Sequence, residues 1–141
     1  MGYRSDVAAV FYVTYSNEPD YPKAKALLDL WYAQLGETKW HRDNFGGCFS
    51  PLNNTHIHGY VFECNDVKWY DSYPSVQQFE HVVKQYYDDY INNSELDGNS
   101  GLNKYFCYEF IRIGEETEDI VEERSFEHDY VLSVARSIHF N

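Results

Sequence analysis

The sequence predicts an α+β fold of the ferredoxin-like kind, a sandwich in which two helices cover one face of a mainly antiparallel sheet. The apolar pattern changes between strand and helix in the order β-α-β-β-α-β and ends with one or two extra C-terminal strands. The length of 141 residues suits a single α+β domain spanning residues 1–141. Hydrophobic residues make up 43% and charged residues 24%, a balance typical of globular domains.

The first strand is expected at residues 7–15 (VAAVFYVTY), because this run is apolar on both faces, as a strand at the centre of a sheet is. Residues 17–20 break it. A helix follows, with Asp20 as its expected N-cap and Gly36 as its end. Its apolar stripe consists of Ala24, Leu27, Leu28, Trp31 and Leu35.

Residues 37–55 are expected to form a long loop that has room for a short strand near Cys48. A hairpin is expected next, with strands at residues 56–64 and 67–70. The Asn65-Asp66 pair between them suits a tight turn that needs positive φ.

The second helix is expected to begin near Ser75, because apolar residues then recur at helical spacing. Residues 92–101 (NNSELDGNSG) have the composition of a loop. Three strands are expected after it, at residues 104–113, 119–124 and 130–140.

The net charge of −12 is unevenly distributed. Residues 1–84 carry 10 acidic and 7 basic side chains, whereas residues 85–141 carry 13 acidic and 4 basic ones. Nucleic acid is excluded as a direct ligand, because phosphate binding depends on Lys and Arg. The expected partner is a protein with a basic surface. The 14 tyrosines either form the core of the sheet or contribute to a contact surface, and a homodimer is left open.

The chain is expected to be cytoplasmic. The opening MGYRSDVAAV has no signal-peptide pattern, and no apolar stretch approaches the roughly 20 residues of a membrane span. Three cysteines without a compact framework do not indicate a secreted scaffold. No cofactor-binding motif is present, so no cofactor is expected.

Three segments carry a resemblance to a known group of proteins: residues 1–7 (MGYRSDV), residues 110–116 (FIRIGEE) with the acidic stretch after them, and residues 134–138 (VARSI). They resemble small proteins of tailed bacteriophages and prophages. The resemblance covers both ends of the chain and not its middle. It implies the cytoplasm of an infected bacterium, where many small acidic phage proteins block host enzymes or defence complexes. No catalytic residue is carried over from it.

The leading candidate site is a run of six carboxylates in nine residues: Glu115, Glu116, Glu118, Asp119, Glu122 and Glu123. Together with Asp88 and Asp89 they are expected to form a row of negative charge. Such a row would inhibit a host protein by imitating the charge of DNA. The structural alternative is a solvated edge strand, whose charges prevent aggregation.

A second hypothesis places Arg4, Arg112 and Arg136 together on the sheet as a pocket for a nucleotide or another anion, since guanidinium groups match phosphate and carboxylate geometry. A small-ligand sponge would be the corresponding function. The structural alternative is an ion-pair network with neighbouring carboxylates.

A third hypothesis is a metal or thiol enzyme. His56 and His58 are expected on one strand face, and Cys48 and Cys64 could join them as ligands. No Cys-x-x-Cys pair, nucleophile elbow or P-loop is present, so neither a metal site nor enzymatic activity is expected.

Overall fold

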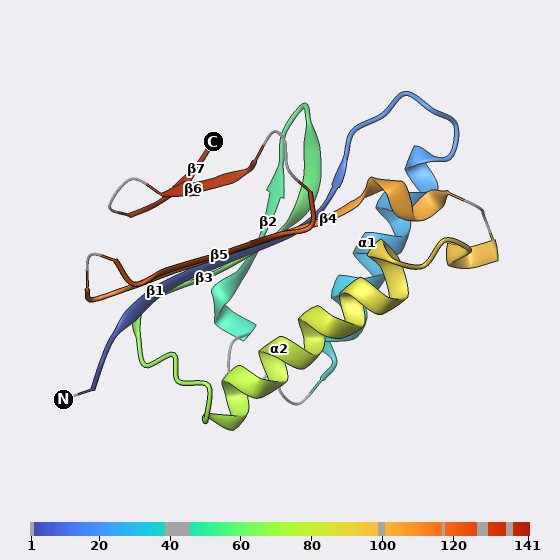
Figure 1. The fold of residues 1–141 in the computed structure, drawn as a ribbon. Helices are drawn as coiled ribbons and strands as arrows, with labels where there is room; N and C mark the ends of the chain where they lie inside the picture. Colours follow the sequence, from blue (N-terminus) through green and yellow to red (C-terminus); the bar gives the residue numbers. More distant parts are fainter. Residues whose placement is uncertain (1, 39–45, 99–100, 117, 127–129, 135–136) are drawn as a thin grey trace.

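A five-stranded antiparallel sheet, ordered β2-β3-β1-β4-β5, carries two helices on one face and a small β6-β7 hairpin on the other (Figure 1). This is seen in a computed structural model that describes residues 2–38, 46–98, 101–116, 118–126, 130–134 and 137–141. The layers confirm the predicted α+β class, the mainly antiparallel sheet and the extra C-terminal strands.

The strands of the sheet are β1 (Ser5–Thr14), β2 (Phe49–Asn53), β3 (Ile57–Val67), β4 (Phe106–Gly114) and β5 (Ile120–Arg124). The hairpin consists of β6 (Leu132–Val134) and β7 (Ile138–Phe140). The helices are α1 (Tyr21–Gly36) and α2 (Pro74–Tyr86), and the π-helical turn η3 (Tyr87–Ile91) extends α2. Short 3-10 turns are η2 (Gly46–Cys48), η4 (Leu96–Gly98) and η5 (Leu102–Tyr105). In the described part of the chain, no helix has both the length and the apolar composition required to cross a membrane.

Strand β1 lies at the centre of the sheet, as predicted, with antiparallel neighbours β3 and β4. Alternate side chains face opposite layers. Phe11 and its alternate neighbours join the core under the helices, while Val10 and Tyr12 join a second core under the hairpin. Residues from Val7 to Val13 are fully buried, which explains why this run is apolar on both faces.

The core under the helices is mainly aromatic. The ring of Phe11 lies 4.8 Å from that of Trp31, 5.1 Å from that of Tyr86 and 4.9 Å from that of Tyr108, measured between centroids. Burying each such side chain contributes roughly 1.5–3 kcal/mol. Many of the tyrosines therefore belong to the core and not to a contact surface.

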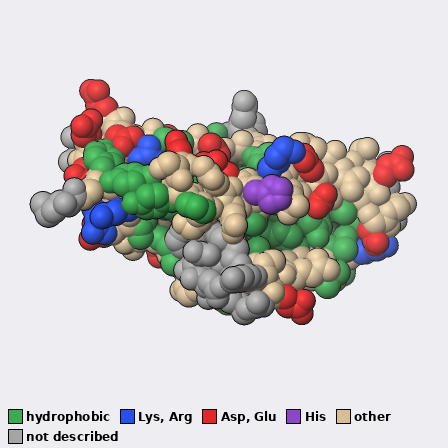
Figure 2. All heavy atoms as spheres, turned by 90° about the horizontal axis from the view of Figure 1, so that it is seen from below, with side chains coloured by type: hydrophobic (Ala, Val, Ile, Leu, Met, Phe, Trp, Pro, Cys, Tyr) green, Lys and Arg blue, Asp and Glu red, His purple; other side chains and the backbone are tan. Residues whose placement is uncertain are grey.

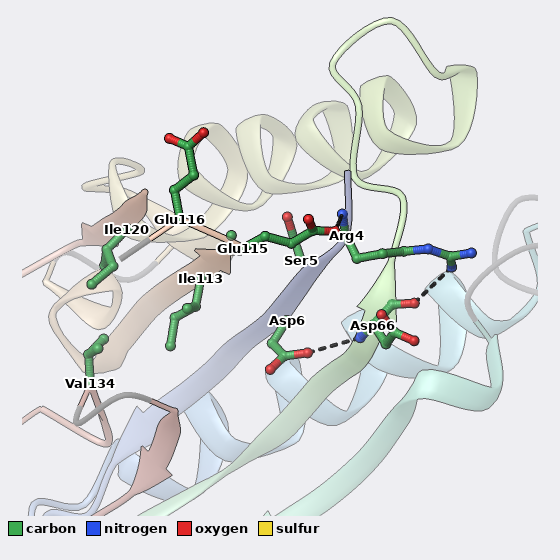
Figure 3. A pocket seen from close by; sticks show the side chains of 10 residues that line it. Arg4, Ser5, Asp6, Asp66, Ile113, Glu115, Glu116, Ile120 and Val134 are labelled. Atoms are coloured by element: carbon green, nitrogen blue, oxygen red, sulfur yellow. Dashed lines mark hydrogen bonds between the residues drawn. The ribbon is translucent and has the colours of Figure 1, made fainter. Parts of the chain in front are cut away.

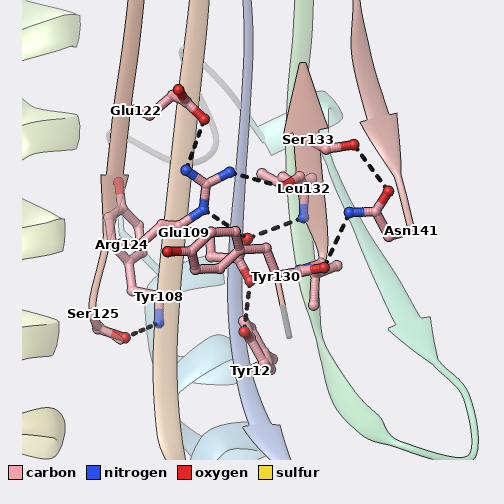
Figure 4. Close-up of polar contacts among 11 residues, drawn as sticks. Tyr12, Tyr108, Glu109, Glu122, Arg124, Ser125, Tyr130, Leu132, Ser133 and Asn141 are labelled. Atoms are coloured by element: carbon pink, nitrogen blue, oxygen red, sulfur yellow. Dashed lines mark hydrogen bonds and ion pairs between the residues drawn. The ribbon is translucent and has the colours of Figure 1, made fainter. Parts of the chain in front are cut away.

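A buried carboxylate attaches the hairpin to the sheet (Figure 4). Glu109 on β4 is fully buried and accepts hydrogen bonds from the Tyr12 hydroxyl (2.6 Å) and from the main-chain amides of Val131 (2.8 Å) and Leu132 (3.0 Å). The Nε atom of Arg124 lies 3.6 Å from the same carboxylate. The charge is therefore compensated by a cation and three donors, which a buried carboxylate requires.

The hairpin predicted at Asn65-Asp66 is wrong. Strand β3 continues through these residues, and its hairpin partner is β2, the short strand foreseen near Cys48. Asp66 does have the positive φ that was expected, 55°, but it lies at a bulge where the β1–β3 register shifts. The carboxylate of Asp6 accepts a hydrogen bond from the Asp66 amide there (2.9 Å). A bulge and a tight turn share this backbone requirement, so the local sequence did not separate them.

Further expectations need correction at three other places. The single strand expected at residues 130–140 is divided between β6 and β7, which pair with each other. The carboxylate of Asp20 does not cap α1 but accepts a hydrogen bond from the Tyr105 hydroxyl. Gly36 is part of α1, and the cap residue after it is right-handed. The sheet order also differs from that of a four-stranded ferredoxin-like sheet, because β5 adds a fifth strand beside β4.

Candidate functional site

The eight carboxylates predicted as one row come from two separate segments of the fold. Asp88 and Asp89 belong to η3, beyond the C-terminal end of α2, where Tyr90 packs on Phe106 at the start of β4. The other six follow Gly114 at the opposite end of β4 or belong to β5. Acidic side chains form separate groups on the face seen in Figure 2. A continuous row of eight charges is therefore not formed.

Several of these carboxylates are neutralised. Asp119 accepts two hydrogen bonds from the Arg112 guanidinium (2.8 and 3.1 Å) and one from the Tyr3 hydroxyl (2.6 Å). The Arg112 guanidinium and then the Tyr3 hydroxyl hold the pKa of Asp119 below its usual value. Glu122 pairs with Arg124 and Asp88 with Lys84, at 2.8 and 2.7 Å.

The remaining members differ in their surroundings. Glu115 accepts a hydrogen bond from the Arg4 amide (2.6 Å). Glu116, Glu118 and Glu123 are exposed, and no residue of the described chain forms an ion pair with them. Register with Phe110 places Glu123 on the helix-covered face of β5.

Glu123 borders a groove between α2 and strands β4 and β5, with a volume of about 470 Å³. The most buried of its lining residues form an aromatic floor, each less than 10% exposed: Trp69, Phe79, Tyr108 and Phe110. Exposed carboxylates from three segments stand around it: Asp71 before α2, Glu80 on α2 and Glu123 on β5. We call these floor and rim residues together the acidic groove.

Negative charge dominates the rim of the acidic groove. Partial burial, and then the neighbouring charges of Asp71 and Glu123, raise the pKa of Glu80. Two cations also line the groove, but Arg112 is paired with Asp119 and Lys84 with Asp88. Asp71 and Glu123 therefore both repel Glu80, and none of the three rim carboxylates forms an ion pair in the described chain, although the charge of Arg112 also acts on Asp71.

The floor contains a polar group without a partner. Tyr108 is 1% exposed, and its main-chain amide donates a hydrogen bond to the Ser125 hydroxyl (2.8 Å). Its phenolic hydroxyl makes no hydrogen bond to any residue that the structure describes. Burial, followed by the charge of Glu123, raises the pKa of this phenol. Among the described residues, Arg124 Nε is the buried side-chain atom without a hydrogen bond, so the Tyr108 hydroxyl opens onto the groove, where water or a ligand group can reach it.

The predicted arginine pocket is not formed by the two arginines that can be placed. Arg112 faces the acidic groove, whereas Arg4 borders a separate hollow of about 350 Å³ (Figure 3). The carboxylates of Asp6, Asp66 and Glu115 also line that hollow, which makes it unsuitable for an anion. Arg136 lies outside the described residues.

The histidines and cysteines do not converge on a metal site. His56 precedes β3 and borders a hollow under the hairpin, while His58 faces α1 and contacts the carboxylate of Asp29. Cys64 is buried beside Cys48, and this burial raises its pKa. Across the residues that the structure places, no three His, Cys, Asp or Glu side chains are arranged to hold a metal ion.

Sequence reasoning identified Glu123 and Arg112 but missed the rest of the acidic groove. Asp71, Glu80 and Trp69 lie far from Glu123 in the sequence, and only the packing of α2 against β5 brings them together. A signal was present in β5, where Val121 and Glu123 alternate onto the face that the helices cover. A carboxylate directed toward the helix layer requires a local explanation.

Comparison of the chain with protein-family models, with curated proteins and with solved structures finds no match. No relative supplies a residue role.

Proposed function

We propose that this chain is a binding protein that holds a basic partner protein. The contact surface would be formed by the β4–β5 turn, β5 and the adjacent side of α2. We call it the acidic surface, and it comprises Asp71, Glu80, Glu116, Glu118 and Glu123. The observation that supports the proposal is that these five carboxylates have no ion-pair partner among the described residues, whereas Asp119, Glu122 and Asp88 do.

Uncompensated carboxylates on one side of a small protein favour encounter with a basic surface. Their field attracts cationic groups and repels phosphates, and its effect on the association rate falls as salt screens it. The net charge of −12 adds to this selectivity.

The specific form that we propose is inhibition of a bacterial host protein that handles nucleic acid or takes part in defence. The acidic surface would occupy a groove that normally holds phosphates. The resemblance to phage proteins directs the search for a partner to bacterial proteins of this kind. The anion-pocket hypothesis has less support than the acidic surface. Arg112 is paired with Asp119, and Arg4 stands among carboxylates.

We further propose that β1 to β4 with α1 and α2 constitute a ferredoxin-like unit, to which β5 and the hairpin are additions. The neighbours of β1 support this: β3 lies on one side of it and β4 on the other, and β2 lies beyond β3. The acidic surface would then lie where the added strand β5 meets the unit.

The test is affinity capture from bacterial lysate, followed by binding measurements with the purified partner. We expect affinity to fall as salt rises and to fall about tenfold or more in the variant Glu116→Gln, Glu118→Gln, Glu123→Gln. The matched control is Glu63→Gln, Asp89→Asn, Glu95→Gln, which removes three exposed carboxylates elsewhere. Equal affinities for the two variants, or an affinity that salt does not change, would contradict the proposal.

A further inference from the structure

We propose that the acidic groove receives the side chain of a partner lysine or arginine, with the cationic group between the rim carboxylates and the aliphatic stem on the aromatic floor. This inference rests on the proposed function and assigns the anchoring contact within it. Three independent features of the acidic groove point to such an occupant.

The first feature is charge. Asp71, Glu80 and Glu123 approach the groove from three different segments, and none of them forms an ion pair with a cation of the described chain. An ammonium or guanidinium group placed among them would supply the missing counter-charge. Arg112 and Lys84 do not supply it, because each is already paired with another carboxylate.

The second feature is the floor. Trp69, Phe79, Tyr108 and Phe110 provide apolar surface for the methylene groups of a lysine or arginine stem. Aromatic faces also attract cations through their quadrupole. A simple carboxylate cluster would offer neither contact.

The third feature is Tyr108, a residue that is 1% exposed and lines the groove, and whose hydroxyl makes no hydrogen bond within the described structure. Its oxygen has lone pairs that accept hydrogen bonds, and both ammonium and guanidinium are pure donors. A cation seated between the rim and the floor could therefore donate a hydrogen bond to a hydroxyl that no residue of the described chain engages.

Size and arrangement favour an organic cation over a metal ion. The groove measures about 470 Å³, which lies in the range of sites for small organic groups. In the part of the chain that the structure describes, the rim carboxylates do not form a cluster fit for metal coordination.

The test uses the purified full chain and two probes of similar shape. Nitrogen-15 NMR is recorded during titration with N-acetyl-lysine methylamide and with N-acetyl-norleucine methylamide, which has an aliphatic stem but no charge. We expect the lysine probe to shift the Trp69 indole and Tyr108 amide signals in a saturable way and the norleucine probe to leave them unchanged. Equal shifts from both probes would overturn the proposal, because the groove would then recognise only apolar surface.

Two double variants separate the groove from the general field of the protein. Glu80→Gln with Glu123→Gln removes two rim charges, whereas Glu116→Gln with Glu118→Gln removes two charges from the neighbouring turn. We expect the rim variant to weaken lysine-probe binding about tenfold and the turn variant to weaken it less than about twofold. Equal weakening would overturn the groove as the site.

Tyr108→Phe tests the hydroxyl, and we expect it to weaken the probe several-fold while the circular dichroism spectrum stays unchanged. If the lysine probe binds but no protein partner with salt-sensitive affinity is found, the groove still binds a cation. The proposal that this cation comes from a partner protein would then be overturned. A partner that binds the rim variant as tightly as the unaltered protein would overturn the groove and leave the proposed function standing.

Discussion

The Tyr12 hydroxyl on β1 donates a 2.6 Å hydrogen bond to the Glu109 carboxylate on β4, and both side chains are fully buried. The same carboxylate accepts the amides of Val131 and Leu132, which lead into the hairpin. One buried charge thus connects the centre of the sheet to the C-terminal strands. Burial of a carboxylate is costly unless each such contact is made, so the network should respond sharply to a single change.

Glu109→Gln should destabilise the protein by about 3 kcal/mol, because the amide nitrogen cannot accept hydrogen bonds and leaves buried donors without a partner. Urea unfolding would measure the loss. Faster hydrogen exchange at residues 131–134 and 137–141 should accompany it.

Glu63→Gln is the control for this change, because Glu63 is an exposed carboxylate of the same sheet, on β3 at the far side of β1. Its effect should stay within about 0.5 kcal/mol. Similar losses in the two variants would show that Glu109 does not hold the hairpin.

Asp119→Asn should remove a pH-dependent contribution to stability. The Arg112 guanidinium and the Tyr3 hydroxyl lower the pKa of Asp119 in the folded protein, so its contribution is complete above the ordinary carboxyl pKa. It disappears as the pH falls through the lowered value. We expect a difference from the unaltered protein on the order of 1 kcal/mol at pH 7 that vanishes in acid.

Unfolding by urea at several pH values would check this, with Glu116→Gln as the control from the same turn. A difference that persists unchanged into acid would contradict the role of the Asp119 charge.

The thiols should differ in reactivity. Burial raises the pKa of Cys107 to about 12 and that of Cys64 further, whereas Cys48 is partly exposed. Since the thiolate is the reactive form, iodoacetamide at neutral pH should modify Cys48 first and the other two only after unfolding. Mass spectrometry of native and urea-treated samples would show the order, and rapid native labelling of Cys107 would contradict it.

The parts of the fold that the sequence predicted are those with a local cause. The run at residues 7–15 is apolar on both faces because both sides of β1 are covered. Both helices were located from the spacing of buried residues such as Leu28 and Phe79. The partner of β3 was mistaken because positive φ at Asp66 serves a bulge as well as a turn.

The candidate site depended on contacts between distant segments. Carboxylates that are adjacent in the sequence of a strand point to opposite faces of the sheet. On β5, Glu123 therefore faces the helices and Glu122 faces the hairpin side. Arg112 was expected to meet an anion, but it is engaged by Asp119 seven residues further on. The alternation in β5 indicates that Glu123 faces the helix layer, but its association with Glu80 depends on where α2 packs on the sheet.

Alkaline pH should unfold the protein. Burial raises the pKa values of Tyr12, Tyr86 and Tyr108 above the ordinary value of 10.0. A group with a raised pKa stabilises the fold fully below its unfolded value, and this stabilisation is lost as the pH rises beyond it. These phenols should ionise together with the loss of circular dichroism. Complete tyrosinate absorbance in a protein that keeps its native spectrum would contradict this.

Tyr86 and Tyr108 can be compared directly, because each is at most 1% exposed and the ring of each packs against Phe11. The Tyr86 hydroxyl donates to the carbonyl oxygens of Cys107 (3.1 Å) and Tyr12 (3.4 Å), whereas the Tyr108 hydroxyl has no partner in the described structure. Tyr86→Phe should therefore cost about 1 kcal/mol in the free energy of unfolding.

Tyr108→Phe should leave that free energy unchanged within about 0.5 kcal/mol, because the hydroxyl that it removes makes no hydrogen bond within the described structure. Urea unfolding of the two variants side by side would measure the difference. A loss for Tyr108→Phe as large as that for Tyr86→Phe would mean that the Tyr108 hydroxyl serves the fold. The Tyr108 hydroxyl would then not be available to a ligand in the acidic groove.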